Sequence, residues 1–128
     1  LLFNRTNSKE KVGKTCIVAT DQPLAFAGYL VRVRFKPEHR PEFVNAFMTS
    51  RYGQALRRGM AKAAVNQANI NATEMKSIPV ALPPSELQLA FAKVLENIDA
   101  ERNRQMVAIA GGGELLSALQ SRAFTGQL

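Results

Sequence analysis

The chain has 128 residues, with 17 lysines and arginines against 10 acidic residues and a formal net charge of +7. This length supports one modest hydrophobic core and excludes two independent domains. No apolar run is long enough to span a bilayer and no secretory signal is recognisable, so no membrane partner is expected. The single cysteine, Cys16, cannot form an intrachain disulfide, which predicts a reducing, cytoplasmic setting.

The positive charge is concentrated in the first half of the chain. Residues 1–68 contain 12 lysines and arginines and four acidic residues, a net charge of +8, whereas residues 69–128 contain five and six, a net charge of −1. A basic globular part joined to a nearly neutral helical part is typical of a polyanion-binding head on a protein-binding stalk. A soluble protein with a basic surface explains the same charges, and composition does not separate the two.

Strands separated by loops are predicted in the first part of the chain. The chain opens in mid-strand, as if cut from a longer one, and continues into a polar, basic loop. Residues 12–19 are then predicted as one strand and residues 25–35 as another. Apolar and basic side chains alternate from Val31 to Phe35, which indicates a sheet strand with one solvated, basic face.

Short helices are predicted next. Pro41 suits the first turn of a helix, and an apolar stripe at helical spacing follows it. Ser50 can cap a second helix, in which two glycines lower the helix propensity. Asn71 and Glu74 form the pattern of a capping box, which predicts one further short helical turn.

The segment from Ile78 to Leu82 alternates like a short half-buried strand. Pro83 and Pro84 then stop regular structure, because proline lacks an N–H and restricts the residue before it. Ser85 with Gln88 forms a second capping-box pattern, and a long helix is predicted behind it.

Side chains spaced alternately by four and three residues form a heptad-like seam on that long helix. The residues expected to pair with a second helix are Phe91, Leu95, Ile98, Arg102, Ile109, Leu116 and Leu119. Each of the three glycines at 111–113 costs roughly 1 kcal/mol relative to alanine inside a helix. They form either a hinge before a second helical piece at 114–124 or a weak joint in one long helix. The apolar stripe predicts a two-fold homodimer.

No active site emerges from the residues. Gly13-Lys14-Thr15 copies the end of a phosphate-binding P-loop, but Ser8 stands at the first glycine position and strand-forming residues follow. Cys16 is expected to be a buried structural thiol and His39 a surface imidazole without a partner. No His, Cys or carboxylate cluster has metal-ligand spacing. The prediction is a non-catalytic protein without cofactor or metal.

Several motifs in a fixed order carry a family resemblance. They are Leu2–Ser8, Val12–Thr15, Phe26–Arg32, Gln67–Asn71, Ile78–Pro79 with Leu82–Pro84, and Leu119–Leu128. In this order they resemble the specificity subunit of type I restriction–modification enzymes, over essentially the whole chain. A complete subunit of that family has two target-recognition domains and two long helices. This chain is similar to the second half of one recognition domain plus one helix, and it departs from the family at its three consecutive glycines.

The resemblance implies an α+β fold, with a partial target-recognition domain (a small sheet with helices) at 1–84 and a long coiled-coil-type helix at 85–128. It also implies a non-catalytic role, in which each recognition domain reads one part of a split double-stranded DNA site. The long helices of the family pair antiparallel, set the spacer and help hold the methyltransferase and restriction subunits, which perform the chemistry. A helix from Ser85 to Ala110 would be about 39 Å long at 1.5 Å per residue, roughly one turn of B-DNA.

Residue chemistry indicates which side chains would meet DNA. Arg or Lys reads guanine and Asn or Gln reads adenine in the major groove, while other basic residues hold phosphates. The candidates are Arg5, Asn7, Ser8, Lys9 and Lys11 in the polar loop, Arg57, Arg58 and Lys62 as phosphate contacts, and Gln67 and Asn69 as further polar contacts. A solvated surface side chain is the alternative for each. The alternative for the whole chain is a protein-interaction module that pairs through its long helix and does not bind DNA.

Overall fold

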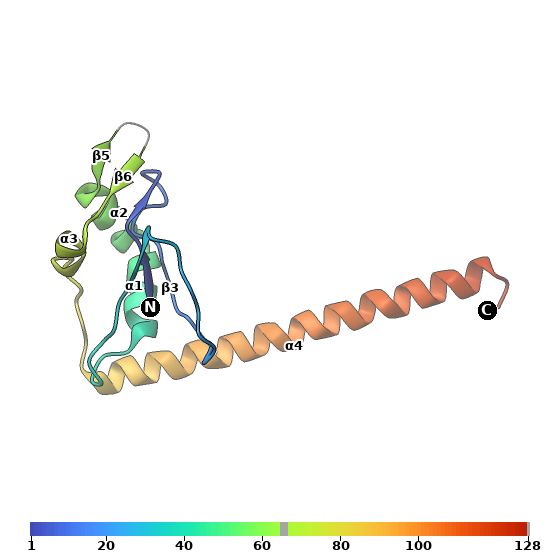
Figure 1. The fold of residues 1–128 in the computed structure, drawn as a ribbon. Helices are drawn as coiled ribbons and strands as arrows, with labels where there is room; N and C mark the ends of the chain where they lie inside the picture. Colours follow the sequence, from blue (N-terminus) through green and yellow to red (C-terminus); the bar gives the residue numbers. More distant parts are fainter. Residues whose placement is uncertain (65–66, 128) are drawn as a thin grey trace. The chain divides into compact units, whose positions relative to one another are not determined.

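The computed structural model describes residues 1–64 and 67–127, which fall into two compact units, Leu1–Ala92 and Lys93–Leu128. The first unit combines short strands with short helices, and the second is helical (Figure 1). The predicted α+β fold, a small sheet with helices followed by a long C-terminal helix, is therefore confirmed.

The first antiparallel sheet has the strand order β3–β1–β4. Its central strand β1 (Leu2–Asn4) pairs with β3 (Thr15–Cys16) on one side and with β4 (Leu30–Arg32) on the other. The predictions of longer strands at 12–19 and 25–35 were wrong. Alternation of side chains reports a half-buried surface, but a strand is only as long as the backbone it pairs with, and β1 has three residues.

The second antiparallel sheet has the order β2–β6–β5. It joins β2 (Thr6–Asn7) to β6 (Gln67–Asn69) and β6 to β5 (Lys62–Ala64). Arg5 links the two sheets, because its N–H donates to the Tyr29 carbonyl and its carbonyl accepts from the Ile70 N–H, both at 2.9 Å. The sequence analysis had placed β2 in a loop.

Two helices pack beside the sheets. In α1 (Pro41–Thr49) the proline lies in the first turn, as predicted. The hydroxyl of Ser50 accepts a hydrogen bond from the Gly53 N–H at 3.1 Å and so caps α2 (Arg51–Met60), which confirms the predicted cap.

The hydrophobic core of the first unit is small. Its buried side chains come from β1, the loop before β3, α1, β6 and the residue after β6: Phe3, Val12, Val44, Met48, Ala68 and Ile70. Partly buried side chains such as Val31 and Phe35 surround this cluster. Because strands and α1 share one core, the two sheets and the helices form a single folding unit.

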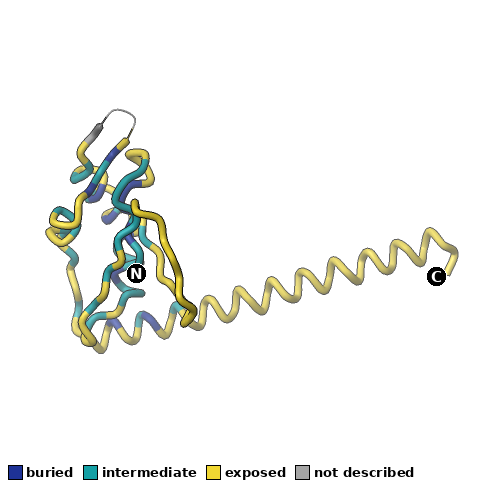
Figure 2. Tube along the Cα trace, in the orientation of Figure 1, coloured by how far each residue is buried: buried dark blue, intermediate teal, exposed yellow. Residues whose placement is uncertain are grey.

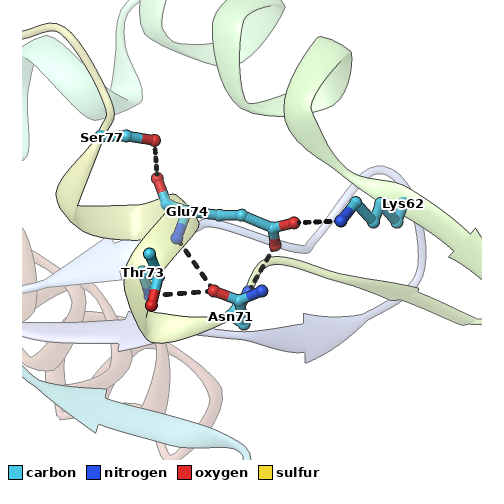
Figure 3. Close-up of polar contacts among 5 residues, drawn as sticks. All are labelled: Lys62, Asn71, Thr73, Glu74 and Ser77. Carbon is cyan, nitrogen blue, oxygen red and sulfur yellow. Dashed lines mark hydrogen bonds and ion pairs between the residues drawn. The ribbon is translucent and has the colours of Figure 1, made fainter.

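The short helix α3 (Ala72–Lys76) begins with the predicted capping box (Figure 3). The side-chain oxygen of Asn71 accepts from the N–H groups of Thr73 and Glu74, each at 2.9 Å. The Glu74 carboxylate accepts in return from the Asn71 N–H at 2.9 Å. The segment Ile78–Leu82 that follows is irregular, so the prediction of a strand there was wrong.

The long helix α4 (Ser85–Phe124) runs through Gly111–Gly113 without a break, so the glycines are a joint in one helix. Its start differs from the prediction. The Pro84 carbonyl accepts from the Gln88 N–H at 3.2 Å, which makes Ser85 the first helical residue instead of the cap. The Gln88 side chain is buried, donates to the Pro83 carbonyl at 2.7 Å and accepts from the Arg40 N–H at 3.0 Å.

Most of α4 is exposed to solvent. Every described residue from Glu96 onward has an exposed side chain (Figure 2). The apolar ones include Met106, Val107 and Ile109. Among the residues that the structure describes, no helix is long and apolar enough to cross a membrane.

Candidate functional site

A basic cleft of about 450 Å³ opens between the loop before β3 and the helices α1 and α2. Lys11 and Lys14 line it from the loop, and Arg57 and Arg58 line it from α2. Glu10 is the one carboxylate among its described lining residues. The excess of positive charge makes the cleft suitable for an anionic group such as a phosphate.

Arg57 differs from the other three basic residues because it is only 3 % exposed. Its Nη1 donates to the Val12 carbonyl at 2.6 Å and to the Glu10 carbonyl at 3.1 Å. Burial, together with the neighbouring Arg58 charge, lowers the pKa of Arg57. These bonds hold the basic loop against α2, and Arg58 is the exposed member of the pair. A phosphate contact from Arg57 stays a prediction.

The basic loop is a compact turn. The Ser8 carbonyl accepts from the N–H groups of Lys11 and Val12 at 3.0 and 2.9 Å. Gly13 has a φ of 75° and donates its N–H to the Asn4 carbonyl at 2.7 Å. A left-handed residue at this point favours glycine. The turn leaves Lys9 and Lys11 exposed.

A second hollow, of about 340 Å³, lies beside β2 and β6. It is lined by Thr6, Asn7, Ser8, Tyr29 and Gln67. The antiparallel register that pairs Asn7 with Ala68 brings Asn7 and Ser8 next to Gln67, although they are about sixty residues apart in the chain. Three of the predicted polar contacts therefore share one surface.

The remaining candidates have partners within the fold. The Asn69 side-chain amide donates to the Thr6 hydroxyl at 3.1 Å across the β2–β6 pair. The ammonium of Lys62 lies 2.7 Å from the Glu74 carboxylate, at the start of α3 (Figure 3). This contact raises the pKa of Lys62, and the hydrogen bonds from Lys62 and the Asn71 N–H lower the pKa of Glu74. Arg5 is half-buried, and its backbone is hydrogen-bonded to Tyr29 and Ile70.

Sequence reasoning missed Lys14, Thr6 and Tyr29 as members of these two surfaces. All three lie within the ordered motifs of the family resemblance, but none had been expected to contact DNA. The pairing of β2 with β6 and the Arg5–Tyr29 hydrogen bond place Thr6 and Tyr29 here.

The residues considered for catalysis or metal binding do not come together. Within the described ranges, no three His, Cys, Asp or Glu side chains lie close enough to hold a metal ion. Cys16 is exposed, so the prediction of a buried thiol was wrong, because β3 is an edge strand. His39 is half-buried instead of fully on the surface.

The residues predicted to pair with another helix lie along α4 in two environments. Phe91 is half-buried, and its ring packs edge-on against Phe43 with centroids 5.5 Å apart. Leu95 is half-buried as well. From Ile98 to Leu119 the seam is exposed, including Arg102, Ile109 and Leu116.

Comparison with known protein families decides the classification. Residues 6–107 match the family model described as type I restriction modification DNA specificity domain. The chain belongs to this DNA specificity family. The matched range runs from β2 into α4 and includes both the basic cleft and the hollow beside β2.

Three specificity subunits are similar to this family member. A putative type I restriction enzyme MjaX specificity subunit from Methanocaldococcus jannaschii is 31% identical over 101 residues, which is 77% of this chain and 24% of the relative. The EcoKI specificity subunit of Escherichia coli K12 is 27% identical over 135 residues, covering 100% of this chain and 29% of the relative. The EcoEI specificity subunit of Escherichia coli is 28% identical, and the matched region is 17% of that relative's length.

This chain therefore spans less than a third of the length of the curated relatives that it matches. No solved structure matches it. The recognition made from the ordered motifs is confirmed by the family model and by these relatives.

Proposed function

We propose that this chain is a DNA-recognition part of a type I restriction–modification specificity subunit, and that it is not itself catalytic. The observation that carries the proposal is the family match over residues 6–107, a range that contains the cleft lined by Lys11, Lys14 and Arg58. The net charge of +8 on residues 1–68 supports the same function, because DNA binding draws most of its affinity from phosphate contacts.

In this proposal the basic cleft and the hollow beside β2 and β6 make different kinds of contact with DNA. Lys11, Lys14 and Arg58 hold backbone phosphates, which fixes the position of the duplex without reading its sequence. Asn7, Ser8, Lys9, Gln67 and Asn69 reach base edges from the neighbouring β2–β6 surface, where amide and hydroxyl groups can pair with bases in the major groove. Arg5 and Lys62 serve as additional phosphate contacts in this proposal.

The long helix has a different role in the proposal. A helix of 40 residues is about 60 Å long at 1.5 Å per residue, enough to separate two DNA-reading parts by more than one turn of B-DNA. We infer that residues 85–128 form a coiled coil with the same helix of a second copy, and that the resulting homodimer reads a bipartite site. The methyltransferase and restriction subunits of the same cytoplasmic system would bind to this scaffold.

A gel-shift titration tests the DNA-binding part of the proposal. The chain is titrated against random-sequence duplex DNA at several salt concentrations, with and without the methyltransferase subunit. Lys11→Glu with Arg58→Glu should weaken binding and reduce the slope of log K against log salt by about two, since each lost phosphate contact removes about one. Lys36→Glu with Lys93→Glu changes the charge equally at exposed positions outside the cleft and is the control.

The alternative function is a protein-interaction module without DNA binding. It is favoured by the exposed apolar side chains of α4, among them Val107, Ile109 and Leu115. If the chain shifts no duplex at low salt in either condition, this alternative replaces the DNA-binding proposal. Equal losses for the cleft variant and its control would point to general attraction between opposite charges, and would contradict a defined phosphate site.

A further inference from the structure

The sheet β2–β6–β5 has two chemically different faces. Ala68, in the middle of β6, is 3 % exposed and belongs to the hydrophobic core. Because side chains alternate between the two faces of a strand, its neighbours Gln67 and Asn69 project away from the core. The Gln67 side chain is exposed and the Asn69 side chain is half-buried. The face away from the core, which we call the outer face, therefore carries two side-chain amides on one strand.

The strand register adds two further polar residues to the outer face. Thr6 of β2 and Lys62 of β5 both stand opposite Asn69, and directly opposite residues of an antiparallel pair project to the same face. Lys62 lies on the edge strand, and its charge is offset by the Glu74 carboxylate at 2.7 Å (Figure 3). The middle of the outer face is thus polar but uncharged, which suits the edges of bases better than phosphates.

A hydrogen bond to Thr6 orients the Asn69 side chain. The Asn69 amide nitrogen donates to the Thr6 hydroxyl at 3.1 Å, and this is its one side-chain hydrogen bond within the described residues. A primary amide has two N–H donors and a carbonyl acceptor, so one N–H and the carbonyl oxygen remain. Adenine requires this pair in the major groove, where it presents an acceptor at N7 and a donor at N6. Thr6 therefore presets Asn69 for reading an adenine.

The spacing of the two amides matches the spacing of bases in DNA. Gln67 and Asn69 are two residues apart on β6, which is about 6.8 Å at about 3.4 Å per residue. Two base steps along one DNA strand also span about 6.8 Å, at about 3.4 Å each. The major groove admits a two-stranded β-ribbon, so β6 and a neighbouring strand can lie along it. The hollow of about 340 Å³ beside Gln67 leaves room for the edge of a base.

Basic residues lie next to the outer face in the chain. Arg5 directly precedes β2, and the turn after β2 carries the exposed Lys9 and Lys11. Phosphates border the major groove on both sides, so a strand that reads bases needs cations beside it and uncharged groups at its centre. The outer face and its surroundings have this distribution of charge.

We propose that the outer face of the β2–β6–β5 sheet lies in the major groove, where Asn69, positioned by Thr6, and Gln67 each read an adenine, two base steps apart. This inference rests on the proposed function and deepens it, because it assigns the sequence preference to two residues of one strand. Thr6 is a positioning residue, since it acts through Asn69. A merely solvated face would have no influence on which DNA sequence is bound.

Selection from duplexes with a randomised central segment tests this assignment in the full chain, with the methyltransferase subunit present. The bound fraction is recovered and sequenced, and the base preference at each position is compared between variants. Asn69→Ala and Gln67→Ala each remove one amide. Thr6→Val removes the hydroxyl at nearly equal size, and Thr6→Ser keeps it. Asn97→Ala removes an exposed amide from α4 and is the control. Circular dichroism verifies that each variant is folded.

The unaltered chain should select adenine at two positions that are two base steps apart. Asn69→Ala should lower the preference at one of them about tenfold and Gln67→Ala at the other, which is the discrimination that one bidentate contact provides. Thr6→Val should weaken the preference severalfold at the Asn69 position alone, whereas Thr6→Ser and Asn97→Ala should retain both preferences.

An unchanged preference in either alanine variant of β6 would overturn the assignment, as would losses at one shared position or equal losses in Thr6→Val and Thr6→Ser. Binding of duplexes without any base preference would overturn this inference and leave the DNA-binding proposal intact. Absence of binding to any duplex would reject both.

Discussion

Arg57 and Arg58 are neighbours on α2 with different environments. Arg57 is buried and donates to the carbonyls of Glu10 and Val12, whereas Arg58 is exposed at the cleft. A charged group that donates to a buried carbonyl, as Arg57 does to Val12, is a structural element, because a buried acceptor that loses its donor destabilises the fold. Adjacent residues of one type therefore carry separate roles in folding and in binding.

This difference gives a paired prediction. Arg57→Met should lower the free energy of unfolding by about 2–3 kcal/mol, because charged hydrogen bonds to Glu10 and Val12 are lost. Arg58→Met should change it by less than about 0.5 kcal/mol, as expected of an exposed side chain, and should weaken DNA binding instead. Urea unfolding followed by circular dichroism measures the first effect. Equal destabilisation by both variants would contradict a structural role particular to Arg57.

Gly53 and Gly59 form a second matched pair on α2. A Cβ at Gly53 would clash with the Phe47 carbonyl and lie 2.8 Å from the Met48 Cα, whereas nothing lies within 4 Å of a Cβ at Gly59. Gly53→Ala should therefore destabilise the chain by about 1–3 kcal/mol. Gly59→Ala should stabilise it by up to about 1 kcal/mol, because alanine is the better helix former. Thermal unfolding distinguishes the two, and a stabilised Gly53→Ala variant would refute the close contact between α1 and α2.

Among the elements, α3 depends most directly on a titrating group. The carboxylate of Glu74 accepts from Lys62 and from the Asn71 N–H, and these hydrogen bonds lower its pKa below the ordinary value. A carboxyl group with a lower pKa in the folded state adds stability above its unfolded pKa, and this stability is lost as the pH falls through the folded pKa. This loss of stability therefore occurs at pH values at and below the ordinary pKa range of glutamate.

The free energy of unfolding should accordingly fall as the pH is lowered through that window. Glu74→Gln should flatten this part of the profile, because the glutamine cannot titrate. Glu96→Gln removes a carboxylate from an exposed position on α4 and serves as the control. Unfolding curves at a series of acidic pH values measure the profile, and an unchanged slope in Glu74→Gln would speak against this contribution.

The helix α4 is continuous although three consecutive glycines lie within it. Gly111 and Gly113 flank the seam position Gly112, and nothing lies within 4 Å of a Cβ placed at any of them. Replacing Gly111 and Gly113 by alanine should increase helicity and stabilise the helix by about 1 kcal/mol per site. Far-ultraviolet circular dichroism during thermal unfolding checks this. A loss of helicity would mean that the glycines form a hinge that alanine cannot adopt.

How well the elements could be predicted depended on how local their signals are. Pro41, Ser50 and the Asn71–Glu74 capping box marked three helix starts correctly, because a cap involves residues within one turn. The prediction that Ser85 caps α4 was wrong, because the Gln88 side chain hydrogen-bonds to Pro83 and Arg40 instead of forming a capping box with Ser85. The strands were overestimated because alternation does not reveal where the partner strand ends.

Across the whole molecule, the distribution of charge follows the division of the chain into two compact units. The first 68 residues carry a net charge of +8, and the cleft and the polar hollow both lie within the first compact unit. The second unit contains the exposed part of α4, with its apolar seam. The proposed DNA contacts lie in the first unit, and all of the proposed pairing residues except Phe91 lie in the second, so substitutions beyond residue 92 can alter pairing without touching the DNA contacts.

The candidate DNA contacts, like the strand lengths, were only partly predictable, because both depend on partners that are distant in the sequence. The polar loop and the arginines of α2 could be recognised by residue type, and the ordered motifs by themselves identified the family. Lys14, Thr6 and Tyr29 joined the surfaces only through strand pairing and loop packing. Residue type indicates which chemistry is available, but it does not show which side chains the fold uses internally.

The sequence by itself determined the family, the α+β class, three helix starts and the concentration of positive charge, because these depend on residue order or on contacts within one helical turn. Only the tertiary structure decided that Arg57 is buried, that Cys16 is exposed and that Gln88 binds Arg40. The Arg57–Val12 and Gln88–Arg40 hydrogen bonds join residues 45 and 48 positions apart. Whether a charged or polar group faces water or a carbonyl is settled by such distant partners, and a local pattern contains no information about them.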